Sequence, residues 1–141
     1  MKFLVVSFLA AGLAVPAFAA STVSQIDCKG TFSQGKLNGK KVSASVKLNQ
    51  AKATVKGNVK TLSESPFTLD VEGAAAVLTS SVSVREIQFG GIKTGLHHNF
   101  IVDLGNGEEL VVNTSNPAIK IAVGHIKYDG SVARKMRCEL K

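Results

Sequence analysis

The chain lacks tryptophan and has one tyrosine and two cysteines, and several functional signatures are missing as well. There is no Cys-x-x-Cys pair, which argues against a thiol redox or zinc motif. The Gly-x-Ser-x-Gly pattern of many serine hydrolases does not occur. Between Lys36 and Lys60 there is no aromatic residue and no arginine, so nucleic acid would find neither stacking platforms nor bidentate contacts there. We therefore expect no nucleic-acid partner, no cofactor and no enzymatic activity.

The N-terminus has the pattern of a secretory signal peptide. Lys2 precedes an apolar run over residues 3–15, and Ala17-Phe18-Ala19 forms a small-x-small cleavage site. This run is too short for a membrane helix, and no later apolar run is long enough for one. We expect residues 1–20 to be removed after bacterial export. Residues 21–141 then form a single β domain in the periplasm or outside the cell.

The two cysteines, Cys28 and Cys138, lie near the two ends of the mature chain. An even number of cysteines in an exported protein indicates a disulfide, because the compartment is oxidising. The alternative, two free thiols at a metal or redox site, has no supporting spacing. We predict a disulfide that joins the first and last strands.

Apolar and polar residues alternate along much of the mature chain, and no segment has a convincing helical period. Residues 42–48 and 51–59 alternate on either side of Asn49-Gln50, which predicts a hairpin with a two-residue turn. The whole pattern predicts an all-β fold: an antiparallel β-sandwich or small β-barrel of about 8–10 short strands, closed by the disulfide.

A second hairpin is predicted at the C-terminus, where Asp129-Gly130 is a strong two-residue turn signal. Pairing outward from this turn places Val123 opposite Met136 and Ile121 opposite Cys138. All four side chains would then lie on the inner face.

A third hairpin is predicted around residues 105–107. In it Phe100 faces Val112 on one side of the sheet. The other side carries Ile101 and Val111, so it is apolar as well and is a candidate contact surface.

Lysine is concentrated in residues 29–60, which contain eight lysines and no acidic residue, in a chain of formal net charge +7. One interpretation is a solvated outer face or a sheet edge that lysines protect from aggregation. The other is a surface for an anionic polymer or lipid of the cell envelope. The candidate anion contacts are Lys36, Lys40, Lys41, Lys47, Lys52, Lys56 and Lys60.

Residues 30–41 come within one residue of a phosphate-binding loop. Two glycines and Lys36 are correctly spaced, but Leu37 stands where the Mg²⁺-binding Ser or Thr is required. A turn signal at Asn38-Gly39 replaces the helix that would receive the phosphates. We predict a lysine-tipped loop between two strands rather than a nucleotide site.

The histidines offer only weak metal candidates. His97 and His98 are neighbours, and neighbouring side chains on a strand point to opposite faces. His98 shares a face with Phe100, so we expect a histidine at the edge of the core with a hydrogen-bond partner. The weak candidates for a zinc or copper site are His97, His125 and Asp103, and we predict no resident metal.

Two functional hypotheses of different classes follow. The first is a non-enzymatic binding module that holds an anionic partner on its lysine-rich face or a ligand in its interior. The second is a protein-interaction or inhibitory module, which meets another envelope protein through the apolar face around Ile101 and Val111. An uncharacterised hydrolase or metal-binding protein is third, because no constellation of side chains requires one.

Overall fold

The computed structural model describes residues 23–91, 95–114 and 120–141, and most of these lie in β-strands. The predicted signal peptide, residues 1–20, lies outside the described residues. Within the described ranges, nine strands form one antiparallel sheet, and a single turn of 3-10 helix joins two of them. Their bounds are β2 Gln25–Thr31, β3 Lys41–Lys47, η1 Gln50–Lys52, β4 Ala53–Lys56, β5 Val59–Val71, β6 Leu78–Gly91, β7 Gly95–Gly105, β8 Glu108–Thr114, β9 Ile121–Tyr128 and β10 Ser131–Leu140.

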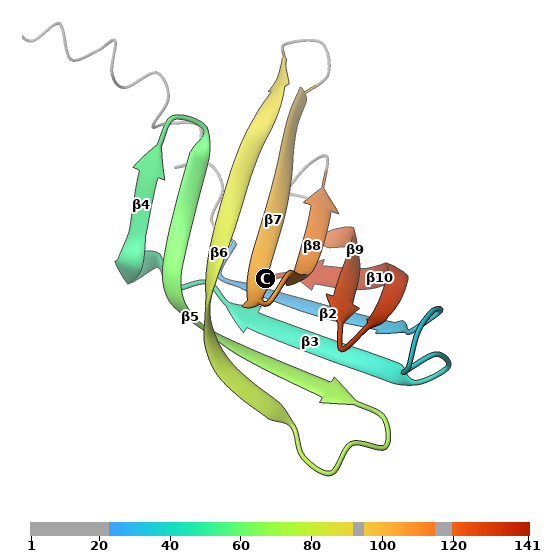
Figure 1. Cartoon of the computed structure of the whole chain (residues 1–141). Helices are drawn as coiled ribbons and strands as arrows, with labels where there is room; N and C mark the ends of the chain where they lie inside the picture. The colour runs from blue at the N-terminus through green and yellow to red at the C-terminus, as the bar shows by residue number, and fades with distance from the viewer. Residues whose placement is uncertain (1–22, 92–94, 115–119) are drawn as a thin grey trace, which may run out of the picture.

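Eight of these strands close into a barrel (Figure 1). From β5 onward each strand pairs with the next along the chain, and β10 returns to pair with β2. β3 pairs with β2 on one side and with the second half of β5 on the other, which completes the ring. β4 pairs only with the first half of β5 and stays outside the ring. The all-β prediction is confirmed, and the architecture is a barrel rather than a sandwich.

A bulge in the middle of β5 divides this strand between two partners. The register shifts between Leu62 and Ser65, where Glu64 has a positive φ of 55°. The buried Ser65 hydroxyl accepts a hydrogen bond of 3.1 Å from the backbone N–H of Asn49, which ties the bulge to the segment after β3. A bulge bends its strand and increases the twist. In Figure 1, β5 and β6 bend together, so β5 meets β4 before the bulge and β3 after it.

Apolar side chains fill the closed part of the barrel. Inward and outward residues alternate along the strands, and the buried hydrophobic residues form one cluster. Ile26 and Cys28 of β2, and Phe32 directly after it, are among the buried residues. The largest fully buried apolar side chains are Phe32, Phe67, Phe100, Ile26, Leu62, Leu69, Leu110, Ile126, Met136 and Leu140.

The predicted disulfide is present. Cys28 and Cys138 lie directly opposite each other on the paired strands β2 and β10, and 110 positions separate them along the chain. β9 passes close to the bond at Gly124, where an added Cβ would lie 2.8 Å from the Cys138 sulfur. Glycine at this position therefore allows the three strands to pack around the disulfide.

The predicted hairpin at Asn49-Gln50 is wrong. Residues 50–52 form the 3-10 turn, and β3 pairs with β2 and β5 instead of β4. β4 makes its own hairpin with β5 through Gly57-Asn58, where Gly57 has a positive φ of 63°. The reason is that the barrel is closed. Each strand of a closed barrel pairs with two neighbours, and those of β3 are β2 and β5.

At the C-terminus the hairpin and its turn are confirmed, but the predicted register is wrong. A bulge lies between Ala133 and Met136, and the strands slip by one residue beyond it. Val123 therefore pairs with Arg137 and Ile121 pairs with Glu139. Both apolar side chains point outward, with 56% and 48% of their surface exposed, instead of into the core.

The third hairpin has the predicted pairs. Phe100 lies opposite Val112 on the inner face, and Ile101 lies opposite Val111 on the outer face. The turn is tighter than the expected three-residue loop, because Gly105 already pairs with Glu108.

Replacing both Cys28 and Cys138 by Ala should lower the free energy of unfolding by about 2 to 5 kcal/mol, since the bond restricts a long loop in the unfolded chain. Urea denaturation followed by circular dichroism measures the change. The far-ultraviolet spectrum of the variant should remain that of a β protein. An unchanged free energy of unfolding would contradict a stabilising role for the bond.

Candidate functional site

One end of the barrel interior is polar, in contrast to the apolar core. On the inner face, Gln88 of β6, His98 of β7 and Thr114 of β8 lie side by side in one row of paired residues. Glu86 lies in the next row, opposite Phe100. All four polar residues are buried.

Glu86 and His98 form a buried pair. The Nδ1 atom of His98 lies 2.8 Å from Oε2 of Glu86, and the two side chains are 1% and 2% exposed. The imidazole ring also stacks on Phe100, with 6.3 Å between the ring centroids. Removing a carboxylate and an imidazole from water is costly, and an apolar pair of similar volume is often at least as stable. Such a pair inside an apolar barrel therefore points to a functional role.

Two buried polar atoms, one on His98 itself and one on the neighbouring Gln88, have no hydrogen-bond partner among the described residues. They are Nε2 of His98 and Oε1 of Gln88. Gln88 and His98 are directly opposite each other on paired strands, so the two atoms belong to adjacent side chains on one face. A buried polar atom without a partner costs about 1–3 kcal/mol, which a bound polar ligand would recover.

The inner face opens to solvent on the β4 side. Val55 of β4, Lys60 of β5 and Glu86 of β6 are consecutive partners in one row, and so they lie on the same face. Exposure falls along the row, from 47% at Val55, through the partly buried Lys60, to 1% at Glu86. We call the inner-face residues Val55, Lys60, Glu86, Gln88 and His98 the barrel mouth.

The seven candidate lysines do not form one surface. Lys36 pairs with Asp129 at 3.2 Å, and Lys52 pairs with Glu64 at 3.7 Å. Lys60 is the one candidate that lies on the inner face, in the barrel mouth. The rest, Lys40, Lys41, Lys47 and Lys56, are exposed in the loop before β3, at the two ends of β3 and at the end of β4.

The loop that resembled a phosphate-binding sequence is held against the β9–β10 turn. The Leu37 N–H donates to the Ser131 hydroxyl at 2.8 Å, and Gln34 forms a bridge with Val132. Gly35 has a positive φ of 89°, and an added Cβ there would collide with the Gly130 carbonyl oxygen. No helix follows it, and β3 begins at Lys41. Gly35 therefore allows the two turns to pack closely.

The weak metal candidates are not brought together. His97 stacks on Phe89 with 5.5 Å between ring centroids, and Asp103 lies six positions further along the same strand. At about 3.3 Å per residue this separation is about 20 Å, too far for a shared ion. Among the described residues, no group of three or more His, Cys, Asp or Glu side chains is placed to hold a metal.

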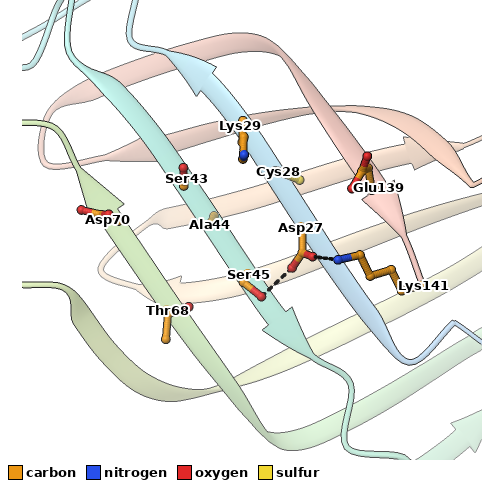
Figure 2. A pocket seen from close by; sticks show the side chains of 10 residues that line it. All are labelled: Asp27, Cys28, Lys29, Ser43, Ala44, Ser45, Thr68, Asp70, Glu139 and Lys141. Atoms are coloured by element: carbon orange, nitrogen blue, oxygen red, sulfur yellow. Dashed lines mark hydrogen bonds and ion pairs between the residues drawn. The ribbon is translucent and has the colours of Figure 1, made fainter.

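A second feature is a shallow groove of about 300 Å³ on the outer wall, over β10, β2, β3 and β5 (Figure 2). Ser43 and Ser45 of β3 are short side chains, and they form its floor between longer ones. Figure 2 shows Asp27 between Ser45 and Lys141, with both contacts drawn. These contacts are each 2.6 Å long.

Asp27 is held in its ionised form. Partial burial alone would raise the pKa of this carboxyl, but hydrogen bonds from Gln25, Lys141 and Ser45 outweigh it and lower the pKa from 3.8 to about 2. The pKa of Lys141 is raised in turn by its hydrogen bond to Asp27. The groove therefore contains an ionised carboxylate, paired with Lys141, across the ordinary pH range.

The apolar face predicted around Ile101 and Val111 is only half-exposed. The more exposed apolar residues of this region are Val123 and Ile121 of β9, which the bulge in β10 turns outward. The candidate contact surface therefore extends from β7 and β8 to β9.

Comparisons with protein-family models, with curated proteins and with solved structures gave no match. Among the described residues, no helix has the length and apolar character that a membrane crossing requires.

Sequence reasoning missed Glu86 and Gln88, although a signal was present. Val82, Val84, Glu86 and Gln88 alternate with outward residues along β6, so two polar residues continue the inward series of two valines. A polar residue in the core register of a strand marks a candidate site. The link to His98 required the pairing of β6 with β7.

The stability of the protein should depend on Asp27 at acid pH. Because the folded pKa is below the unfolded value of 3.8, the contribution is complete above 3.8 and is lost as the pH falls toward 2. Between about pH 5 and about pH 2, the native chain should lose on the order of 1 kcal/mol more of its unfolding free energy than Asp27→Asn, because solvent screens part of the interaction. Urea denaturation at the two pH values measures this difference, and equal losses would contradict the assignment.

Proposed function

We propose that the protein is an exported, non-enzymatic binding module that holds a small organic anion in the barrel mouth. The observation that carries this proposal is the buried Nε2 atom of His98, which has no partner although its ring is fixed by Glu86. Ligand sites commonly occur in the mouths of β-barrels, where an apolar lining carries a few convergent polar groups.

Glu86 is bonded to His98, so Lys60 is the charge in the barrel mouth that an anionic ligand would meet. Lys60 is the partner of Glu86 across the β5–β6 ladder, and His98 bonds Glu86 from the other side. Glu86 is therefore flanked by the Lys60 ammonium and by the imidazole of His98. A ligand carboxylate would pair with Lys60, and ligand hydroxyl groups would hydrogen-bond to Nε2 of His98 and donate to Oε1 of Gln88.

The proposed location and class have separate support. A disulfide between the first and last strands suits an oxidising compartment outside the cytoplasm. The proposal assigns no reaction, because a nucleophile–base pair requires a hydroxyl or thiol bonded to the base, and Nε2 of His98 bonds no described group. An anionic polymer bound across a lysine-rich face has less support, because the lysines are dispersed and two are already paired.

Small carboxylates should bind the purified protein and stabilise it, and Lys60 should be required. Acetate, lactate and succinate are tested by isothermal titration and thermal melting, with uncharged acetamide as the matched ligand control. Lys60→Ser should raise the dissociation constant about tenfold or more, because a charge-assisted contact is lost.

The control variant is Lys56→Ser, which removes one lysine from the outer face of the same hairpin and should bind as the native protein does. Circular dichroism establishes that both variants fold. No binding by any of the three carboxylates, or equal binding by the Lys60 and Lys56 variants, would refute the proposal.

A further inference from the structure

Like charges face each other on the outer wall at the closure of the barrel. Arg137 of β10 lies directly opposite Lys29 of β2, and Glu139 lies directly opposite Asp27. The Cys28–Cys138 pair is the rung between these two rows, and it points inward. A basic row and an acidic row therefore run side by side across the same two strands.

Like charges placed directly across a ladder destabilise a sheet, and no direct ion pair offsets the repulsion in the basic row. Neither Lys29 nor Arg137 forms an ion pair or a side-chain hydrogen bond with any described residue. If Arg137 and Glu139 exchanged places on β10, each would lie opposite a residue of the other charge on β2. The observed order costs stability in the single chain, and it is the order that a complementary partner would need.

We propose that this wall is a docking surface for a second copy of the chain. The two copies would be related by a two-fold axis that lies between their walls and runs parallel to the line from Cys28 to Cys138. Such an axis reverses the strand direction, so the basic row of one copy faces the acidic row of the other. Glu139 then meets Arg137 of the second copy, and the reciprocal contact forms at the same time. A two-fold interface must be self-complementary in this way.

The flanking strands fit the same axis. On β9, the exposed Ile121 and Val123 are the partners of Glu139 and Arg137, so the operation places Ile121 over Val123 of the second copy. Burying these side chains gives the contact an apolar component, which exposed ion pairs alone supply poorly.

On the other side of the ladder, the axis brings the two serines of β3 together. Ser45 is the partner of Asp27, and Ser43 is the partner of Lys29. Figure 2 shows these short side chains beside Asp27 and Lys29, and because they are short, the two copies can approach closely at this edge of the contact. Each column of the wall thus meets a residue of matching chemistry.

The acidic row is ready for this contact. Hydrogen bonds from Ser45 and Gln25 and the ion pair with Lys141 keep Asp27 ionised and fixed in orientation. Glu139 is exposed beside it on β10. Docking therefore requires little ordering of this side of the interface, which lowers the entropic cost of association.

Charge exchange on β10 tests the proposal, with sedimentation velocity of the disulfide-bonded protein at low and high salt as the readout. The native protein should form dimers at low salt that dissociate at high salt, because salt screens exposed charges. Arg137→Glu alone and Glu139→Arg alone should each be monomeric, since each places like charges face to face. The double variant that carries both changes should dimerise again, and so should an equal mixture of the two single variants.

Lys56→Glu on β4 is the matched control, because it makes the same change of charge as Arg137→Glu away from the wall and should leave the dimer intact. Circular dichroism establishes that each variant folds. The proposal is overturned if the native protein is monomeric at low salt, if either single variant dimerises as well as the native protein, or if the double variant and the mixture stay monomeric.

Discussion

The bulge in β5 is the constraint on which the rest of the molecule depends. A single straight β5 would have to pair with either β3 or β4 along its whole length. The extra residue at the bulge around Glu64 lets the first half of the strand pair with β4 and the second half with β3. Closure of the ring follows from the second half, and the open side of the inner face follows from the first.

The same division separates core from site. On the side of the bulge where β5 pairs with β3, the closed ring surrounds apolar side chains. Burial of their surface is the main contribution to stability. On the side where β5 pairs with β4, the inner face has an exposed Val55 at its edge and, further inside, the buried pair of Glu86 and His98. A polar cluster in this position gains less stability than an apolar one would. Its place where the inner face opens makes ligand binding its best explanation.

On the outer wall, too, side chains that lower the stability of the single chain are placed where they could serve a contact. Lys29 and Arg137 repel each other across the ladder, while Asp27 and Glu139 do the same one rung away. The disulfide lies between these two rows and stabilises the strands that carry them. The two like-charged rows therefore lie on the pair of strands that the disulfide joins.

Local pattern was sufficient for a large part of the fold. Alternation and compartment chemistry predicted the all-β class and the bond between Cys28 and Cys138, and a turn signal predicted the pair of Phe100 and Val112. The partnership of β3 with β5 was not predictable in this way, since it depends on ring closure and not on either segment's own sequence.

The bulges explain most of the remaining differences. One extra residue in β10 reverses the expected direction of Ile121 and Val123, and it lies at the adjacent charged residues Arg134 and Lys135, where the alternation breaks. The candidate site was missed for a related reason. Glu86 and His98 are far apart in the sequence, and only the register of β6 against β7 places them in contact.

The most direct test of the central claim is ¹⁵N nuclear magnetic resonance of the three histidine side chains, recorded during a titration with succinate. The His98 resonances should identify a ring whose Nδ1 is bonded to Glu86, and its Nε2 signal should move most as the ligand binds. His97 and His125 lie on the outer face and should change little. A His98 signal that stays fixed throughout the titration would contradict a ligand site in the barrel mouth.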